Sequence, residues 1–181
     1  METRLLGGAN GWLKMVIDAP ITNLQVLAPS RKRRRAGDVF RMQLPDNRFL
    51  FGRLIRTDAK WTITEGSRGV NLIYIFDVVS SSGIPDLDAL TRDRLLIRPL
   101  FTNNLPWSRG YFETVLNVEL QREDILQEHC FKFTPWADAY FNDDGVRVAR
   151  SQGPIGIYAL DSFLTIDDAV SVAMGIPKVA H

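Results

Sequence analysis

A continuous run of apolar and β-branched residues at positions 71–79 limits the folds that this chain can adopt. The run is followed by a Ser-Ser-Ser-Gly stretch at residues 80–83. Its β-branched and aromatic content and the turn residues behind it are typical of a buried strand. We predict further strands in residues 39–44, 48–56, 94–98, 111–118, 139–141 and 146–148. Because these segments do not alternate with helical patterns, the sequence does not favour a parallel α/β sheet.

Turn residues join two pairs of the predicted strands. Residues 45–47, Pro-Asp-Asn, separate 39–44 from 48–56, and residues 142–145, Asn-Asp-Asp-Gly, separate 139–141 from 146–148. Both arrangements are typical of β-hairpins. Gly52, inside the second strand, indicates either a bulge or a place where another backbone comes close.

Helical signals are few and short. Residues 86–91 and 121–127 fit one or two turns each, and residues 165–174 fit a longer helix that Gly175 ends. Thr165 is the expected N-cap of that helix, with Asp167 and Asp168 in its first turn. We therefore predict a mainly β fold of the β-rich α+β class. It is a strongly bent antiparallel sheet, or a small partly open barrel, with two or three short helices.

The composition is that of an ordinary globular protein. The chain has 181 residues, 45% of them hydrophobic and 24% charged, and no apolar run approaches the roughly 20 residues that span a bilayer. Its single cysteine, Cys130, cannot form an intrachain disulfide, and residues 1–19 lack the apolar core of a signal peptide. We expect a cytoplasmic protein that does not contact a membrane.

The charges are unevenly distributed along the chain, although the formal net charge is +1. Residues 31–60 contain ten Lys and Arg against three Asp and Glu, whereas residues 61–181 contain ten against sixteen. Such asymmetry indicates a contact with a charged partner. We expect an N-terminal extension, residues 1–36, that carries the basic run 31–35, and a single globular domain, residues 37–181.

The sequence offers little for catalysis or metal binding. Its histidines are His129 and His181, and a Cys–His mechanism would need His129 to meet Cys130, although neighbours on a strand point to opposite faces. One cysteine and two histidines do not make a usual zinc site, and residues 142–145 lack the later ligands of a calcium loop. The paired acids of the chain fall in turns or helix starts, where solvated carboxylates are expected. We predict no enzyme activity, no catalytic residue, no metal and no cofactor.

One compact motif resembles a known family. Residues 37–44 read Gly-Asp-Val-Phe-Arg-Met-Gln-Leu, Pro45 follows, and residues 49–54 read Phe-Leu-Phe-Gly-Arg-Leu. This pattern resembles the immunity protein 26 family of bacterial polymorphic-toxin systems, and looser similarity extends to about residue 175. The resemblance implies a protein that binds a co-encoded toxin domain and neutralises it by occlusion. The motif residues that we expect to be structural are Gly37, Asp38, Val39, Phe40, Phe49, Phe51, Gly52 and Arg53.

Two hypotheses about the partner follow. In the first, a toxin domain is bound by the acidic part of the chain, and the expected toxin-binding residues are Asp86, Asp88, Glu123, Asp124, Asp143 and Asp144. In the alternative, a small-barrel nucleic-acid-binding protein uses the basic run, with Arg33, Arg34 and Arg35 as possible contacts. The net acidity of residues 61–181 opposes a broad nucleic-acid footprint. The basic run can also be a solvated segment, and the oligomeric state is left open.

Overall fold

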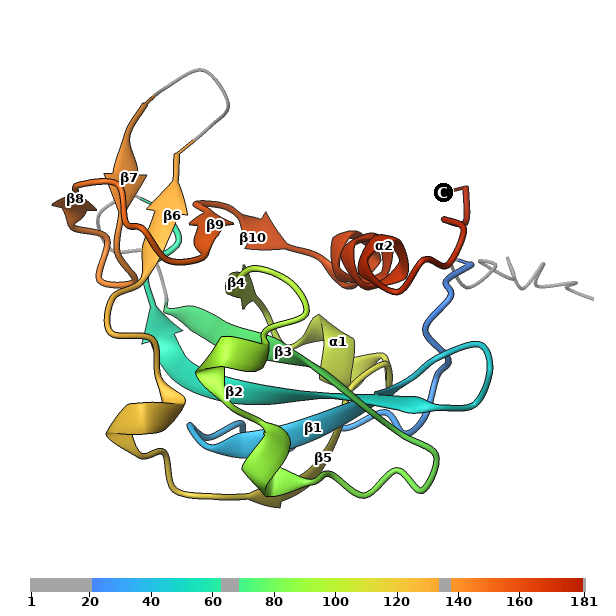
Figure 1. Ribbon diagram of the computed structural model, residues 1–181. Coiled ribbons are helices and arrows are strands. Elements are labelled where there is room, and N and C mark those ends of the chain that lie inside the picture. Colours follow the sequence, from blue (N-terminus) through green and yellow to red (C-terminus); the bar gives the residue numbers. More distant parts are fainter. Residues whose placement is uncertain (1–20, 63–68, 134–137, 181) are drawn as a thin grey trace, which may run out of the picture.

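The computed structural model describes residues 21–62, 69–133 and 138–180, and these form two sheets and two α-helices (Figure 1). The order of the six-stranded sheet is β10-β4-β3-β2-β1-β5, and that of the four-stranded sheet is β8-β7-β6-β9. The strands of the larger sheet are β1 (Asp38–Gln43), β2 (Phe49–Ala59), β3 (Val70–Ser80), β4 (Leu100–Thr102), β5 (Glu113–Asn117) and β10 (Leu160–Asp161). Those of the smaller sheet are β6 (Cys130–Lys132), β7 (Tyr140–Phe141), β8 (Arg147–Val148) and β9 (Ile155–Ile157). The predicted mainly β, α+β class is confirmed, and neither sheet closes into a barrel.

The two predicted hairpins are present. Strands β1 and β2 pair antiparallel from Val39 opposite Arg53 to Gln43 opposite Phe49. Asn47 takes a positive φ of 66° in the connecting turn, a conformation that Asn tolerates better than most residues. Strands β7 and β8 also pair antiparallel across residues 142–146.

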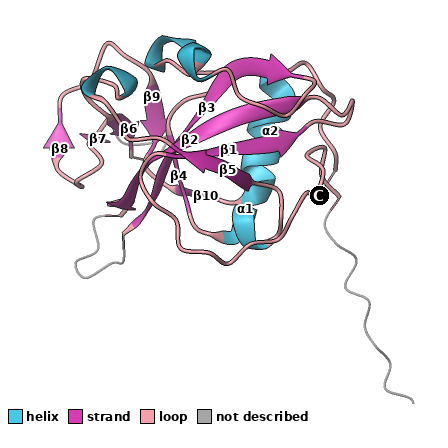
Figure 2. Ribbon diagram, turned by 90° about the horizontal axis from the view of Figure 1, so that it is seen from below, coloured by secondary structure: helices cyan, strands magenta, loops and turns pink. Residues whose placement is uncertain are grey.

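Both faces of the six-stranded sheet are covered by other parts of the chain. Successive side chains along β1, β2 and β3 point to opposite faces and so contribute to two separate cores. One face, with Phe40, Leu54 and Ile75, packs against α1 (Leu105–Ser108) and α2 (Phe163–Ala173). Figure 2 shows α2 running behind the strands of this sheet. The other face, with Phe51 and Tyr74, is covered by the four-stranded sheet and by residues 89–95 and 118–133.

Two of the predicted helices are shorter than expected, and one begins earlier. Residues 86–91 and 121–127 contain only the 3₁₀ turns η1 (Leu87–Ala89) and η3 (Arg122–Asp124). The N-cap of α2 is Ser162, not Thr165, because the Ser162 hydroxyl accepts a hydrogen bond from the Thr165 amide at 3.2 Å. The helix starts earlier because Phe163 already packs on the core, stacked on Tyr111 with ring centroids 4.9 Å apart. Asp167 and Asp168 therefore fall in the second turn.

The predicted strand 94–98 is wrong. Arg94 closes a 3₁₀ turn, η2 (Arg92–Arg94), so few residues remain extended before Pro99. Leu95 makes a single bridge to Phe76, and the Leu96 amide donates to the Ile75 carbonyl at 2.9 Å. The two parallel pairs, β10 with β4 and β6 with β9, were not predicted either. Strands of two or three residues carry too short a pattern to reveal their direction.

Residues 21–36 lie against the larger sheet. Leu24 is buried in the core, and Gln25 forms a bridge to Gln43. Asp167 of α2, itself buried, accepts hydrogen bonds from the amides of Asn23 and Leu24. The rest of the expected extension, residues 1–20, lies outside the described residues, and the domain boundary at residue 36 stays a prediction. Among the described residues, no helix is long and apolar enough to cross a membrane.

Candidate functional site

Gly52 lets the Phe40 side chain of the neighbouring strand pack directly over its backbone. A Cβ atom at Gly52 would lie 2.2 Å from the Phe40 ring and 2.7 Å from the Tyr74 carbonyl oxygen. Phe40 in turn stacks on Phe112, with ring centroids 4.5 Å apart, and meets Trp107 edge-on at 5.2 Å. Of the two alternatives for Gly52, the close approach is therefore the right one, since the register shift between β2 and β3 lies one step earlier, between Leu50 and Phe51.

Gly37 and Asp38 fix the chain where it enters β1. The Asp38 carboxylate accepts hydrogen bonds from the Arg35 amide at 3.0 Å and from the Asn117 side-chain amide at 2.8 Å. Gly37 has a φ of +87°, and a Cβ there would lie 2.2 Å from the Val118 carbonyl oxygen. Only glycine suits this position without strain.

Arg53 holds a covering segment onto the sheet. It is 5% exposed and shares the face of Phe51 and Ile55. One guanidinium nitrogen lies 3.1 Å from the Asp124 carboxylate, and another donates to the carbonyls of Val118 and Glu119. The motif arginine thus binds the segment that leads into η3, which explains a charged residue in a buried strand.

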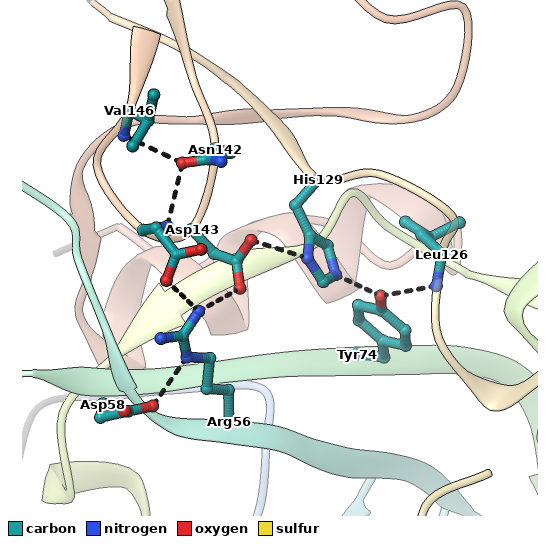
Figure 3. A network of polar contacts seen from close by, with 9 residues as sticks. Arg56, Asp58, Tyr74, Leu126, His129, Asn142, Asp143 and Val146 are labelled. Carbon is teal, nitrogen blue, oxygen red and sulfur yellow. Dashed lines mark hydrogen bonds and ion pairs between the residues drawn. The ribbon is translucent and has the colours of Figure 1, made fainter. Parts of the chain in front are cut away.

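A polar network joins the two sheets (Figure 3). Tyr74 of β3 and Arg56 of β2 come from the larger sheet, while His129, just before β6, and Asp143, just after β7, come with the smaller one. The Tyr74 hydroxyl lies 2.5 Å from His129 Nε2, and His129 Nδ1 lies 3.0 Å from Asp143 Oδ1. Arg56 then binds the second Asp143 oxygen at 2.9 Å. We call these four residues the joint network.

The joint network is a continuous chain of hydrogen bonds. The Tyr74 oxygen accepts a hydrogen bond from the Leu126 amide at 3.2 Å and also lies within hydrogen-bond distance of His129 Nε2. His129 Nδ1 contacts Asp143 on the other side of the ring, so each polar atom of the relay has a partner. The order of groups is that of a nucleophile, a base and an orienting acid. Tyr74 is fully buried, and burial raises the pKa of its hydroxyl, so this group is shielded from solvent and links the two sheets through His129 and Asp143.

The charges of the joint network stabilise ionised Asp143. Burial by itself opposes ionisation, but the hydrogen bonds and charges of His129 and Arg56 outweigh it and lower the pKa of Asp143 to about 2. Arg56 also binds Asp58 and Asp144, and these carboxylates raise its pKa. The sequence pattern did not reveal this site, because its four members are far apart in the chain.

Comparison with known families decides the identity of this architecture. The family model described as Immunity protein 26 matches residues 35–142, more than half of the chain. The chain belongs to the immunity protein 26 family. A comparison with curated proteins and one with solved structures gave no match. The matched range contains the whole motif and the segment that Arg53 binds. It also contains three of the four residues of the joint network, Arg56, Tyr74 and His129.

The six acids expected at the toxin contact of this immunity protein 26 member occupy two kinds of environment. Asp86, Asp88 and Glu123 are exposed. Asp124 and Asp143 are not the solvated turn acids that the sequence suggested, because they pair with Arg53 and with Arg56 and His129. Asp144 is exposed but lies 2.6 Å from Arg56.

A hollow of about 670 Å³ has one of these acids, Glu123, in its lining. It is lined by Arg92, Arg122, Glu123, Ile125, Leu126 and Gln127. The Arg92 guanidinium donates to the Ile125 carbonyl at 2.9 Å and so connects the residues after η1 with those after η3. Among the described residues, no group of three or more His, Cys, Asp or Glu side chains is placed to hold a metal ion.

The basic run of this immunity protein 26 member is not uniformly solvated. Arg34 is 8% exposed and lies over the Trp107 ring, 5.4 Å from its centroid. It donates to Thr114 Oγ1 and Ser30 Oγ, both at 2.9 Å, and burial lowers its pKa. Arg34 is therefore buried against the body of the protein, whereas Arg33 and Arg35 are exposed. Five consecutive basic residues give no sequence signal that shows which side chain points inward.

Proposed function

We propose that this protein binds a toxin domain encoded beside it and neutralises that domain by covering its active surface. Membership of the immunity protein 26 family, on the match over residues 35–142, carries the proposal. Binding by occlusion needs a rigid surface rather than reacting groups. The buried motif, Arg53 and the joint network supply such rigidity on the side of the sheet where residues 89–95 and 118–133 lie.

The contact surface that we propose is an acidic face formed by Asp86, Asp88 and Glu123. Asp86 and Asp88 flank Leu87, which is 44% exposed, and Ile84 nearby is 71% exposed. Exposed apolar side chains between acids suit a protein partner with a basic surface. Asp124 follows Glu123, and its pairing with Arg53 helps to keep this segment in place. We expect Asp143 and Asp144, which pair with Arg56, to contribute to the toxin contact as well.

The loop that carries Asp86 and Asp88 is held at both ends. The Gly83 carbonyl accepts a hydrogen bond from Arg41 at 3.2 Å, and Leu90 is buried beneath η1. A loop fixed in this way loses little conformational entropy on binding, which favours affinity. Figure 1 shows the turns of residues 87–94 and 122–124 on the same side of the larger sheet.

Co-expression tests the proposal. The test uses the C-terminal domain of the toxin that the proposal places in the neighbouring gene. This toxin domain is expressed in a bacterial host with and without the present protein. We expect arrested growth with the toxin domain alone and restored growth when both are present. A toxin domain inactivated in its catalytic residues serves as the control for expression load. Unrestored growth, with this protein present in folded form, would overturn the proposal.

A further inference from the structure

A groove with a cationic wall runs between residues 28–35 and the edge strand β5. Its volume is about 600 Å³. It is lined by Ala28, Pro29, Ser30, Lys32, Arg33, Arg34, Arg35, Asp38, Glu113, Thr114 and Asn117. We call it the basic groove.

The cationic wall of the basic groove is fixed in place. The Ser30 amide donates to the Trp107 carbonyl at 2.9 Å, and the Arg35 amide donates to Asp38 at 3.0 Å. Between these two points Arg34 turns inward and binds Thr114 of β5. Its neighbours Arg33 and Arg35 are consequently held outward, so the cations are arranged before any partner arrives.

The two acids in the lining of the basic groove offset its four cations only in part. Asp38 is occupied by the Arg35 amide and by Asn117, and Glu113 binds Arg41 at 2.7 Å. Among the described residues, Lys32, Arg33 and Arg35 form no ion pair. The surplus charge of the groove is therefore positive.

The other wall is an open sheet edge. Strand β5 ends the order of the six-stranded sheet, and β1 is its one hydrogen-bonded neighbour among the described strands (Figure 2). An edge strand presents backbone N–H and C=O groups that can pair with a further strand. Trp107, the aromatic ring nearest the run, is fully buried beneath Arg34 and offers no surface on which a base could stack.

We propose that the basic groove binds an extended acidic segment of a partner protein, which adds to the sheet along β5 while its carboxylates meet Lys32, Arg33 and Arg35. Strand addition supplies the main-chain hydrogen bonds, and the cations select the charge of the incoming segment. Nucleic acid, the alternative occupant of a cationic surface, gains nothing from a strand edge. This surface is separate from the acidic face, and its test does not depend on the toxin.

Fluorescence anisotropy with defined probes tests this proposal on the full chain. The probes are labelled peptides of alternating Glu and Thr, of alternating Glu and Pro, and of alternating Lys and Thr, together with oligothymidine. Proline retains the spacing of the charges but cannot donate the hydrogen bonds of a strand. We expect the Glu–Thr peptide to bind about tenfold more tightly than the Glu–Pro peptide, and the Lys–Thr peptide not to bind.

A pair of charge-reversal variants locates the binding. Arg33→Glu with Arg35→Glu should weaken binding of the Glu–Thr peptide at least about tenfold. The matched control is Arg147→Glu with Arg150→Glu, two exposed arginines that give the same change in net charge. Equal losses in both variants, equal affinity for the Glu–Pro peptide, no binding of the Glu–Thr peptide, or tighter binding of oligothymidine would each overturn the proposal.

Discussion

Gly52 shows how one residue can set the geometry of a core. Its missing side chain provides the space that the Phe40 ring occupies, and Phe40 then packs on Phe112 and Trp107. The motif is thus a packing arrangement, in which the glycine and the aromatic residues depend on one another.

Gly52→Ala should destabilise the protein by about 2 kcal/mol or more, because the Phe40 ring and the Tyr74 carbonyl oxygen cannot both move away. Urea denaturation measures the difference. Gly153→Ala is the matched control, since the nearest atom to its new Cβ is Ser151 Oγ at 3.4 Å, and it should stay within about 0.5 kcal/mol of the parent. Equal stability of the two variants would contradict the packing role of Gly52.

Phe40→Ala should cost about 3–5 kcal/mol, because Phe40 is fully buried against two aromatic rings. Phe51→Ala, buried on the other face, should cost a similar amount. Thermal melting of both variants, measured alongside protection against the toxin, checks this. A variant with an unchanged melting temperature and lost protection would instead make that phenylalanine a contact residue.

Between elements, arginines attach the covering segments to the larger sheet. Arg53 binds residues 118–124, and Arg56 binds the turn after β7 through Asp143 and Asp144. These arginines come from β2, one of the longest strands, so a single element holds both the segment that contains Glu123 and the joint between the sheets.

Arg53→Met keeps the apolar stem but leaves Asp124 and two carbonyls without their partner, at a cost of about 3 kcal/mol. Hydrogen exchange followed by mass spectrometry should show that the exchange rate, relative to the parent protein, increases more in residues 118–124 than in β1. Arg94→Met, at an exposed arginine that donates to the Asp77 carbonyl, is the control and should leave both regions unchanged. Uniformly faster exchange over the whole chain would show that Arg53 does not act on this segment in particular.

The joint network predicts a loss of stability in acid. The pKa of Asp143 is lower in the folded protein, about 2, than its ordinary value of 3.8. Its contribution is therefore complete above pH 4 and is lost as the pH falls towards 2, and the shift corresponds to about 2 kcal/mol. Denaturation between pH 5 and pH 2 should show a shallower decline for Asp143→Asn than for the parent. Parallel pH profiles would mean that Asp143 is not held ionised by His129 and Arg56.

The sequence predicted the elements whose pattern is long and failed where the structure depends on distant residues. Residues 39–44, 48–56 and 71–79 are rich in apolar, β-branched and aromatic residues over enough positions to specify strands. Arg94 and Pro99 leave too short a run for the predicted strand 94–98, and Phe163 moved the start of α2 towards the N-terminus. The joint network was not predicted, because nothing local to Arg56 or Tyr74 points to a histidine after residue 125.

For the whole molecule, the charge asymmetry of the sequence is partly cancelled by folding. Arg41, Arg53 and Arg56, from the basic half, pair with acids of residues 113–144. Among the charged residues that stay exposed are the cations Arg33 and Arg35 and the acids Asp86, Asp88 and Glu123. Two surfaces of opposite charge are therefore expected to bind partners of different character.

The association rate with the toxin domain, measured by stopped flow at low and at high salt, tests the proposed acidic face most directly. Asp86→Asn with Asp88→Asn should lower this rate severalfold at low salt and little at high salt, because steering by exposed charges is screened. The control pair, Asp46→Asn with Asp138→Asn, removes two exposed acids elsewhere and should leave the rate nearly unchanged. If the Asp86 and Asp88 pair associates as fast as the parent at low salt, while Arg33→Glu with Arg35→Glu abolishes toxin binding, the toxin contact lies at the basic groove and the acidic face is wrong.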